Sequence, residues 1–170
     1  MNLDWRKYNK YIILSFSILM VVLDQLFKWL AKIFLYDLPG RTHPVIKDVF
    51  HLTYIENRGA AFGLFDGKGI FLILLTSAII AGCVLLLLLE KIKSPFLMWS
   101  IGLVIGGGIG NLIDRLFRHY VIDYLDFRLI NFAVFNFADC CVVIGTIMVL
   151  VFVVFLERKT IRAPQENKDE

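Results

Sequence analysis

The apolar run from Ile70 to Leu89 is the feature that most restricts what this chain can fold into. It contains 20 residues and no charged side chain. About 20 residues of α-helix cross the roughly 30 Å hydrocarbon core of a bilayer, so the run predicts a transmembrane helix. Across the 170 residues the hydrophobic content is 58%. Soluble proteins average roughly 45–50%, so the composition also indicates an integral membrane protein.

Three further apolar runs are long enough to cross a membrane. They are Tyr11–Leu35, Phe96–Ile113 and Cys140–Leu156. The run Phe96–Ile113 carries glycines at 102, 106 and 110, a spacing that allows helices to pack closely. The sequence thus predicts an all-α membrane protein, one domain over residues 1–170. Its four transmembrane helices are expected at about 11–32, 69–89, 96–113 and 138–156.

Two mixed segments, 36–68 and 114–137, are expected to lie outside the membrane. In the first, Phe50, Leu52 and Tyr54 alternate with polar residues, which is the period of a half-buried strand. We therefore expect a small β-sheet, or cradle, within 36–68. The stretch Asn57–Phe62 contains Gly-Ala-Ala, which suits either a peptide-binding strand or a plain turn. Residues 114–137 form a second short segment, too mixed to cross.

Four spans place both chain ends on one side of the membrane. Lys and Arg are equally divided between the two sides, but those at the termini and in the 90–95 loop lie in short segments beside helix ends, where the positive-inside rule operates. We expect 1–10, 90–95 and 157–170 to be cytoplasmic, with 36–68 and 114–137 outside. Seven polar residues then gather towards the outer side: Asp24, Asn57, Asn111, Asp114, Asp123, Asn136 and Asp139.

Asp139 lies at the edge of the last apolar run, and Asp123 lies in the preceding segment. A charged Asp costs roughly 2.5–3.5 kcal/mol at a bilayer centre, so such groups stay at helix ends or are paired. Two converging carboxylates tend to share a proton, leaving one base and one acid that can activate water against a peptide bond. The alternative is that Asn136 caps the last helix, with Asp139 at its third position. The local pattern alone favours the cap.

Two other acidic residues have basic neighbours at helical spacing. Asp24, Lys28 and Lys32 are four residues apart and share one helix face. That face is either a polar helix end or a surface turned towards a site, and the pattern leaves both open. Asp114 precedes Arg118 by four residues, so a local ion pair is its simplest interpretation.

Other chemistries find little support. The net charge is +3 and the basic residues are scattered, which argues against a nucleic-acid partner. No serine stands in a nucleophile motif. No metal-ligand spacing joins the histidines and cysteines, which are His43, His51, His119, Cys83, Cys140 and Cys141. We therefore expect no metal or other cofactor, and we interpret the cysteines as packing residues. The paired aspartates remain.

Five motifs carry a family resemblance. They are Asp24-Gln-x-x-Lys28, Asn57-x-Gly-Ala-Ala-Phe62, Gly110-Asn-Leu-Ile-Asp-Arg115, Val121-Ile-Asp123 and Phe135-Asn-Phe-Ala-Asp139. Their order and spacing resemble those of lipoprotein signal peptidase, the bacterial signal peptidase II, over nearly the whole chain. The resemblance implies a four-helix aspartic protease of the bacterial cytoplasmic membrane, with its site towards the outer face. Such an enzyme removes the signal peptide from diacylglyceryl-modified prolipoproteins by cutting before the lipidated cysteine.

By motif match, Asp123 and Asp139 are similar to the family's catalytic pair. The matching supporting positions are Asp24, Lys28, Asn57, Gly59, Asn111, Asp114, Arg115 and Asn136. Phe27 and Cys140 depart from the family pattern, which has Ser or Thr and Ser at these places, and neither removes a catalytic carboxylate. We expect a monomer whose partners are membrane lipids and diacylglyceryl-modified prolipoprotein substrates. The alternatives are a small ion-coupled transporter, since membrane acids also relay protons, and a non-catalytic scaffold.

Overall fold

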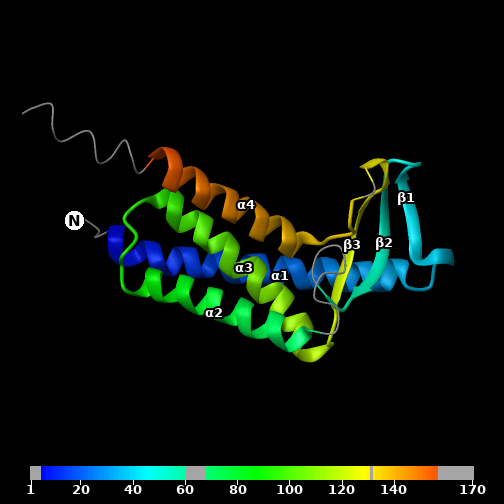
Figure 1. Ribbon diagram of the computed structural model, residues 1–170, viewed down its shortest axis with the longest axis horizontal. Coiled ribbons are helices and arrows are strands. Elements are labelled where there is room, and N and C mark those ends of the chain that lie inside the picture. The colour runs from blue at the N-terminus through cyan, green and yellow to red at the C-terminus, as the bar shows by residue number, and fades with distance from the viewer. Residues whose placement is uncertain (1–4, 60–67, 131, 157–170) are drawn as a thin grey trace, which may run out of the picture.

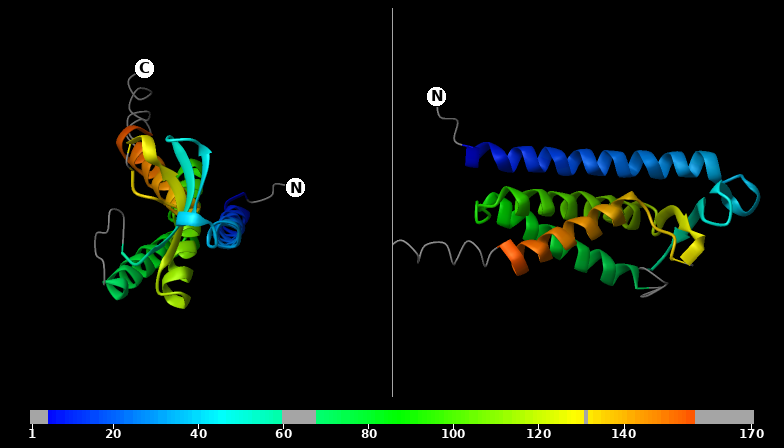
Figure 2. Two further views of the ribbon diagram at one scale, coloured as in Figure 1. Left: turned by 90° about the vertical axis from the view of Figure 1, so that its right-hand side faces the viewer. Right: turned by 90° about the horizontal axis from the view of Figure 1, so that it is seen from above.

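The computed structural model describes residues 5–59, 68–130 and 132–156. Four long helices make up most of it: α1 (Trp5–Leu35), α2 (Gly69–Leu88), α3 (Pro95–Phe117) and α4 (Phe137–Val151), the last continued by a π-helical turn at Phe152–Leu156. All four are long and apolar enough to span a membrane, so the predicted four-helix membrane fold is confirmed. They form one elongated bundle with a small sheet at one end (Figures 1 and 2).

Three consecutive glycines allow α3 to pack against each of the other helices. Successive helical residues point about 100° apart, so Gly106, Gly107 and Gly108 face different neighbours. A Cβ on Gly106 would lie 2.7 Å from Met20 Cβ of α1, and one on Gly108 would lie 3.1 Å from Ile80 Cγ1 of α2. A Cβ on Gly107 would collide with the carbonyl oxygen of Ala138 in α4. The small residues therefore place α3 at the centre of the bundle.

The helix boundaries differ from the prediction at two places. α1 extends over Trp5–Leu35, beyond the expected 11–32 at both ends. α3 runs to Phe117 rather than 113, so Asp114 lies on the helix rather than after it. The prediction placed the end of α3 at its first polar residues. These side chains are instead satisfied inside the bundle, so the helix continues.

The extramembrane sheet has three antiparallel strands in the order β1-β2-β3: β1 (Thr42–Ile46), β2 (Phe50–Asn57) and β3 (Val121–Phe127). The expected sheet is thus confirmed, and its third strand, β3, comes from the second of the two mixed segments. Its two acidic residues obscured the strand pattern. The pairing sets Asn57 opposite Val121 and Ile55 opposite Asp123. One face of the sheet packs Tyr54, Ile122 and Tyr124 against the end of α1.

The start of α1, the α2–α3 connection and the end of α4 lie together at the end of the bundle opposite the sheet (Figure 1). Lys10 Nζ lies 2.8 Å from Glu90 Oε1 at this end. The start of α1, the α2–α3 connection and the end of α4 therefore share one end of the bundle, and their placement on the cytoplasmic side stays a prediction. Residues 60–62 of the Asn57–Phe62 motif and the tail from residue 157 lie outside the described residues.

Candidate active site

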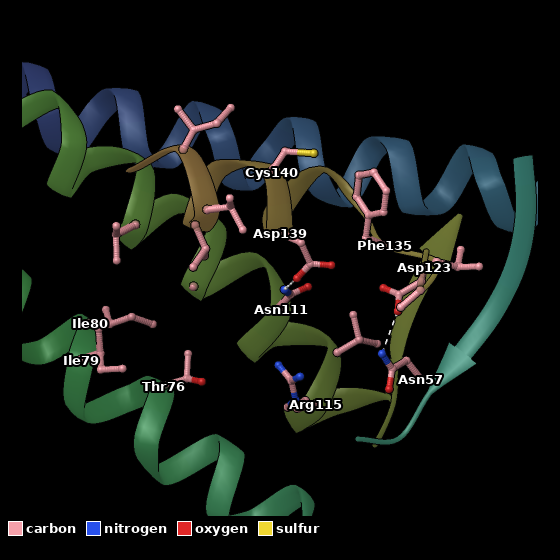
Figure 3. Close-up of a pocket in the computed structure, with 18 of the residues that line it drawn as sticks. Asn57, Thr76, Ile79, Ile80, Asn111, Arg115, Asp123, Phe135, Asp139 and Cys140 are labelled. Atoms are coloured by element: carbon pink, nitrogen blue, oxygen red, sulfur yellow. Dashed lines mark hydrogen bonds between the residues drawn. The ribbon is translucent and has the colours of Figure 1, made fainter. Parts of the chain in front are cut away.

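A cavity of about 560 Å³ opens where the sheet meets helices α2, α3 and α4 (Figure 3). One part of its lining is polar: Asn57, Asn111, Arg115, Asp123 and Asp139. The other part is apolar and is contributed mainly by the helices, including Ile79, Ile80, Val104, Val143 and Ile144. The cavity therefore joins a cluster of charged and amide groups to a surface suited to an aliphatic or apolar peptide ligand.

Asp123 reaches the cavity from β3 and is fixed by two amides. Asn57 Nδ2, from the neighbouring strand β2, donates to Asp123 Oδ2 at 2.8 Å. Asn136 Nδ2 donates to Asp123 Oδ1 at 2.6 Å. The side chain is buried, and both of its oxygens accept hydrogen bonds. The strand pairing therefore presents this carboxylate in one orientation.

Asp139 caps α4 and lines the cavity at the same time. Asn136 Oδ1 accepts from Asp139 N at 2.9 Å, while Asp139 Oδ2 accepts from Asn136 N at 3.1 Å. This is a reciprocal capping box, so the capping interpretation is confirmed. The second oxygen, Oδ1, accepts from Asn111 Nδ2 at 2.8 Å. The two interpretations weighed from the sequence are therefore compatible, because each oxygen of the carboxylate has its own partner.

Asn136 connects the two aspartates. Its Nδ2 donates to Asp123, and its backbone N–H donates to Asp139. Figure 3 shows the two carboxylates facing the same cavity from β3 and from the first turn of α4. The structure thus brings together two acidic residues whose proximity no sequence pattern could establish.

The pKa of Asp123 is raised from 3.8 to about 7, chiefly by burial and also by the nearby Asp139 carboxylate. The hydrogen bonds from Asn57 and Asn136, and the charge of Lys28, act the opposite way. A carboxyl group with this pKa holds a proton near neutral pH and exchanges it readily. Two carboxylates on one cavity, one of them with a pKa near neutrality, are suited to paired acid and base chemistry.

Arg115 supplies positive charge at the polar part of the cavity. Its Nη2 donates to the carbonyl oxygen of Gly59 at 3.2 Å. Gly59 N in turn donates to Asn57 Oδ1 at 2.9 Å, which orients the amide that holds Asp123. Both Arg115 and Gly59 therefore support the site from the same side.

Asp24, Lys28 and Asp114 lie behind the cavity and are fully buried. Lys28 Nζ lies 2.8 Å from Asp24 Oδ2 and 3.1 Å from Asp114 Oδ2. Lys32 is exposed, so of the two lysines on this face of α1 only Lys28 is buried in the bundle. The local Asp114–Arg118 ion pair is confirmed, but Lys28 is a second partner that the sequence did not indicate.

Sequence reasoning assigned no role to Gln25 or to the α2 residues of the cavity. Gln25 Nε2 donates to Asp114 Oδ1 at 3.2 Å and to the carbonyl oxygen of Gly110 at 3.1 Å, and its Oε1 accepts from Arg118. Its position beside Asp24 in a membrane helix could have indicated a role, because polar residues in such helices usually face the bundle interior and pair with other polar groups. Thr76, Ile79 and Ile80 gave no signal, since α2 is apolar on every side.

The two positions that depart from the family pattern have defined surroundings. The Phe27 ring packs edge-on against Phe137, with centroids 5.4 Å apart. Cys140 lines the cavity beside Asp139. Within residues 5–59, 68–130 and 132–156, no three His, Cys, Asp or Glu side chains come together as metal ligands would.

Comparison with known proteins adds the following similarities. A family model described as signal peptidase (SPase) II matches residues 16–155. The lipoprotein signal peptidase of Clostridioides difficile is 45% identical over 144 residues, covering 84% of this chain and 95% of that protein. The lipoprotein signal peptidase of Caldanaerobacter subterraneus is 43% identical over 136 residues, covering 79% and 90%. A solved bacterial membrane enzyme superposes with a TM-score of 0.78 at 27% identity, covering 92% of this chain and 94% of that one.

Proposed function

The chain belongs to the signal peptidase II family, and from this premise we propose that it is an aspartic endopeptidase that uses Asp123 and Asp139 as its catalytic pair. The observation that carries the proposal is the arrangement of these two carboxylates on one cavity, each bonded to Asn136. The substrates are diacylglyceryl-modified prolipoproteins, cut before the lipidated cysteine. The apolar part of the cavity supports this choice, because it suits an acyl chain or an apolar signal segment.

In the proposed reaction the pair carries one proton. The ionised carboxylate takes a proton from water, and the water oxygen bonds to the scissile carbonyl carbon. The protonated carboxyl group donates its proton to the carbonyl oxygen, which gives a neutral gem-diol. When the C–N bond breaks, one carboxyl group returns a proton to the leaving amine and the other accepts one from the diol. The Asp123 pKa of about 7 supports this sharing near neutral pH.

The remaining polar groups hold the pair in place. Asn57, Asn111 and Asn136 donate to the two carboxylates and fix their orientation. Arg115 places a positive charge near both aspartates, which offsets the negative charge that the pair carries. Both carboxylates line the cavity, which is where a water molecule and a peptide bond would reach them.

The direct test is cleavage of a defined substrate by the protein in lipid vesicles. A prolipoprotein bearing the diacylglyceryl group should be cut to release its signal peptide, and the product should begin at the modified cysteine. The same precursor without the lipid group is the control, and we expect it to be cut far more slowly. If vesicles instead show ion-driven solute uptake and no cleavage, the transporter alternative replaces the proposal.

We also propose that the protein lies in the bacterial cytoplasmic membrane with the sheet and the site towards the outer face. Single cysteines at positions within 41–48 should then react with an impermeant thiol reagent applied to intact cells. Cysteines at positions within 91–94 should react only after the membrane is opened. The reverse labelling pattern would contradict this orientation.

A further inference from the structure

Each aspartate of the pair directly follows a residue whose backbone N–H is held by a buried carboxylate. Ala138 N, one residue before Asp139, donates to Asp24 Oδ1 at 3.0 Å. Ile122 N, one residue before Asp123, donates to Asp114 Oδ2 at 3.1 Å. Asp24 belongs to α1 and Asp114 to α3, so each part of the pair is attached to a different helix.

Lys28 joins these two carboxylates. Its Nζ lies 2.8 Å from Asp24 Oδ2 and 3.1 Å from Asp114 Oδ2, and all three side chains are fully buried. The same Nζ donates to Asn111 Oδ1 at 2.8 Å, and Asn111 Nδ2 donates to Asp139 Oδ1 at 2.8 Å. One ammonium group therefore connects both backbone attachments and one of the carboxylates.

The charges in this cluster balance, which allows it to remain buried. Arg118 pairs with the other oxygen of Asp114, so two cations face two carboxylates. Charge-assisted hydrogen bonds are shorter and stronger than neutral ones, especially where water is excluded. Such contacts hold their atoms within a narrow range of positions, as a site needs when it depends on a fixed separation.

We propose that the Lys28, Asp24 and Asp114 cluster is a positioning device that sets the separation of Asp123 and Asp139. The inference rests on the proposed function and names what holds its catalytic pair. Within the described residues, the cavity lining includes none from α1. Helix α1 therefore acts on the reaction from behind the site, through Asp24 and Lys28.

The packing of α3 offers a clean way to disturb this device. Gly110 leaves room for the carboxylate of Asp24, because a Cβ there would lie 2.5 Å from Asp24 Oδ2. Gly102 packs against the same helix further from the site, where a Cβ would lie 3.0 Å from Ile13 Cγ2 and 3.2 Å from Phe16 Cδ1. Both are buried in the α1–α3 contact, and they differ in whether Asp24 is their neighbour.

The experiment compares Gly110→Ala with Gly102→Ala in lipid vesicles, with turnover expressed per folded molecule. Both variants should lose stability. Gly110→Ala should lower kcat by about 10²-fold, because a shift of about 1 Å in a catalytic group has an effect of that size. Its KM should stay within about twofold, since Asp24 does not line the cavity. Gly102→Ala should keep both constants within about twofold.

Asp24→Asn and Asp24→Ala provide a second measurement that does not depend on Gly110. Asn keeps a carbonyl oxygen that accepts from Ala138 N, whereas Ala removes it, so the Asn variant should recover a large part of the kcat that the Ala variant loses. Equal kcat in these two variants, or equal kcat per folded molecule in both glycine variants, would overturn the inference. If the wild-type protein cleaves no substrate, the proposed function fails instead, and the two failures are distinct.

Discussion

Two pairs of aspartates lie close together in this protein, and they are held in opposite ways. Asp24 and Asp114 are fully buried and share the ammonium group of Lys28. Asp123 and Asp139 face a cavity and accept hydrogen bonds from amides and backbone N–H groups. Among the residues that the structure describes, no Lys or Arg nitrogen lies within 4.0 Å of a carboxylate oxygen of Asp123 or Asp139.

The difference shows how one residue type serves two purposes. A carboxylate that shares a buried ammonium group is held by short, charge-assisted hydrogen bonds, so it acts as a structural anchor. A carboxyl group held by neutral amides beside another carboxyl group keeps a proton that it can exchange. The protein thus separates the charge that holds its architecture from the proton that its chemistry would use, although the two pairs are linked through Asn111.

The largest effect is expected from neutralising the cavity-facing pair. Asp123→Asn and Asp139→Asn should each lower turnover on the order of 10⁴-fold, about 5.5 kcal/mol of barrier, because Asn cannot act as acid or base. Since the two groups act as one unit, the double variant should be hardly worse than either single one. Initial rates on a lipidated substrate measure this.

Asp126→Asn is the matched control for that experiment. Asp126 lies on the same strand as Asp123, but it accepts from Thr53 Oγ1 at 2.7 Å and Arg128 Nε at 2.9 Å, away from the cavity. It should keep turnover within a few-fold of wild type. If Asp139 served only as a helix cap, Asp139→Asn would cost roughly 1 kcal/mol of stability and leave an active enzyme, which would end the dyad proposal.

The next effect concerns the anchoring pair. Lys28→Met should destabilise the protein by about 3–5 kcal/mol, because it leaves two carboxylates buried without their shared cation. Thermal unfolding in a mild detergent measures this change. Arg128→Met, which removes a partly exposed partner of Asp126, should cost at most about 1 kcal/mol. Equal losses in both variants would mean that the buried cluster does not anchor the bundle.

A smaller effect is expected in the pH dependence of turnover. Above pH about 7, Asp123 loses its proton, so the pair becomes doubly ionised and has no acid left. We expect kcat/KM to fall as the pH rises through this value. Asn57 donates to the ionised form and so lowers the pKa of Asp123. Asn57→Ala should therefore move the alkaline decline to higher pH.

The same pKa fixes the sign of one contribution to stability. Asp123 has a higher pKa when folded than its ordinary 3.8, so the folded state binds its proton more tightly. This contribution is fully present below pH about 4 and is lost as the pH rises to about 7. The free energy of unfolding measured across this range should fall with rising pH, and the slope should be shallower in Asp123→Asn. If neither turnover nor stability changed with pH in this range, the raised pKa of Asp123 would be contradicted.

The smallest effect is expected from the cysteines. Replacing Cys83, Cys140 and Cys141 together with Ala should leave turnover within about twofold, because no thiol-activating base accompanies them. Cys141 is 4% exposed, so a stability loss of about 1 kcal/mol from its small cavity is expected. Cys140 lines the cavity beside Asp139, which makes this variant a strict test. A folded triple variant without activity would reopen a cysteine mechanism.

Local sequence patterns were sufficient for the features that arise within one segment. Charge-poor runs predicted the four helices, because the length of apolar helix needed to cross a bilayer is fixed. Four-residue spacing predicted the Asp24–Lys28 and Asp114–Arg118 pairs, and the Asn136–Asp139 spacing predicted the cap. Each of these contacts joins residues one helical turn apart, so the backbone geometry alone brings them together.

The tertiary structure decided which segments meet. The pairing of β3 with β2 presents Asp123, and the packing of α4 on α3 brings Asp139 to the same cavity. The contact between Lys28 and Asp114 likewise depends on the close approach of α1 and α3. Periodicity tells which face of a segment is apolar or polar, but not which other face it will contact. The sequence by itself therefore determined the helices and their local ion pairs, whereas only long-range packing and strand pairing placed the two aspartates side by side.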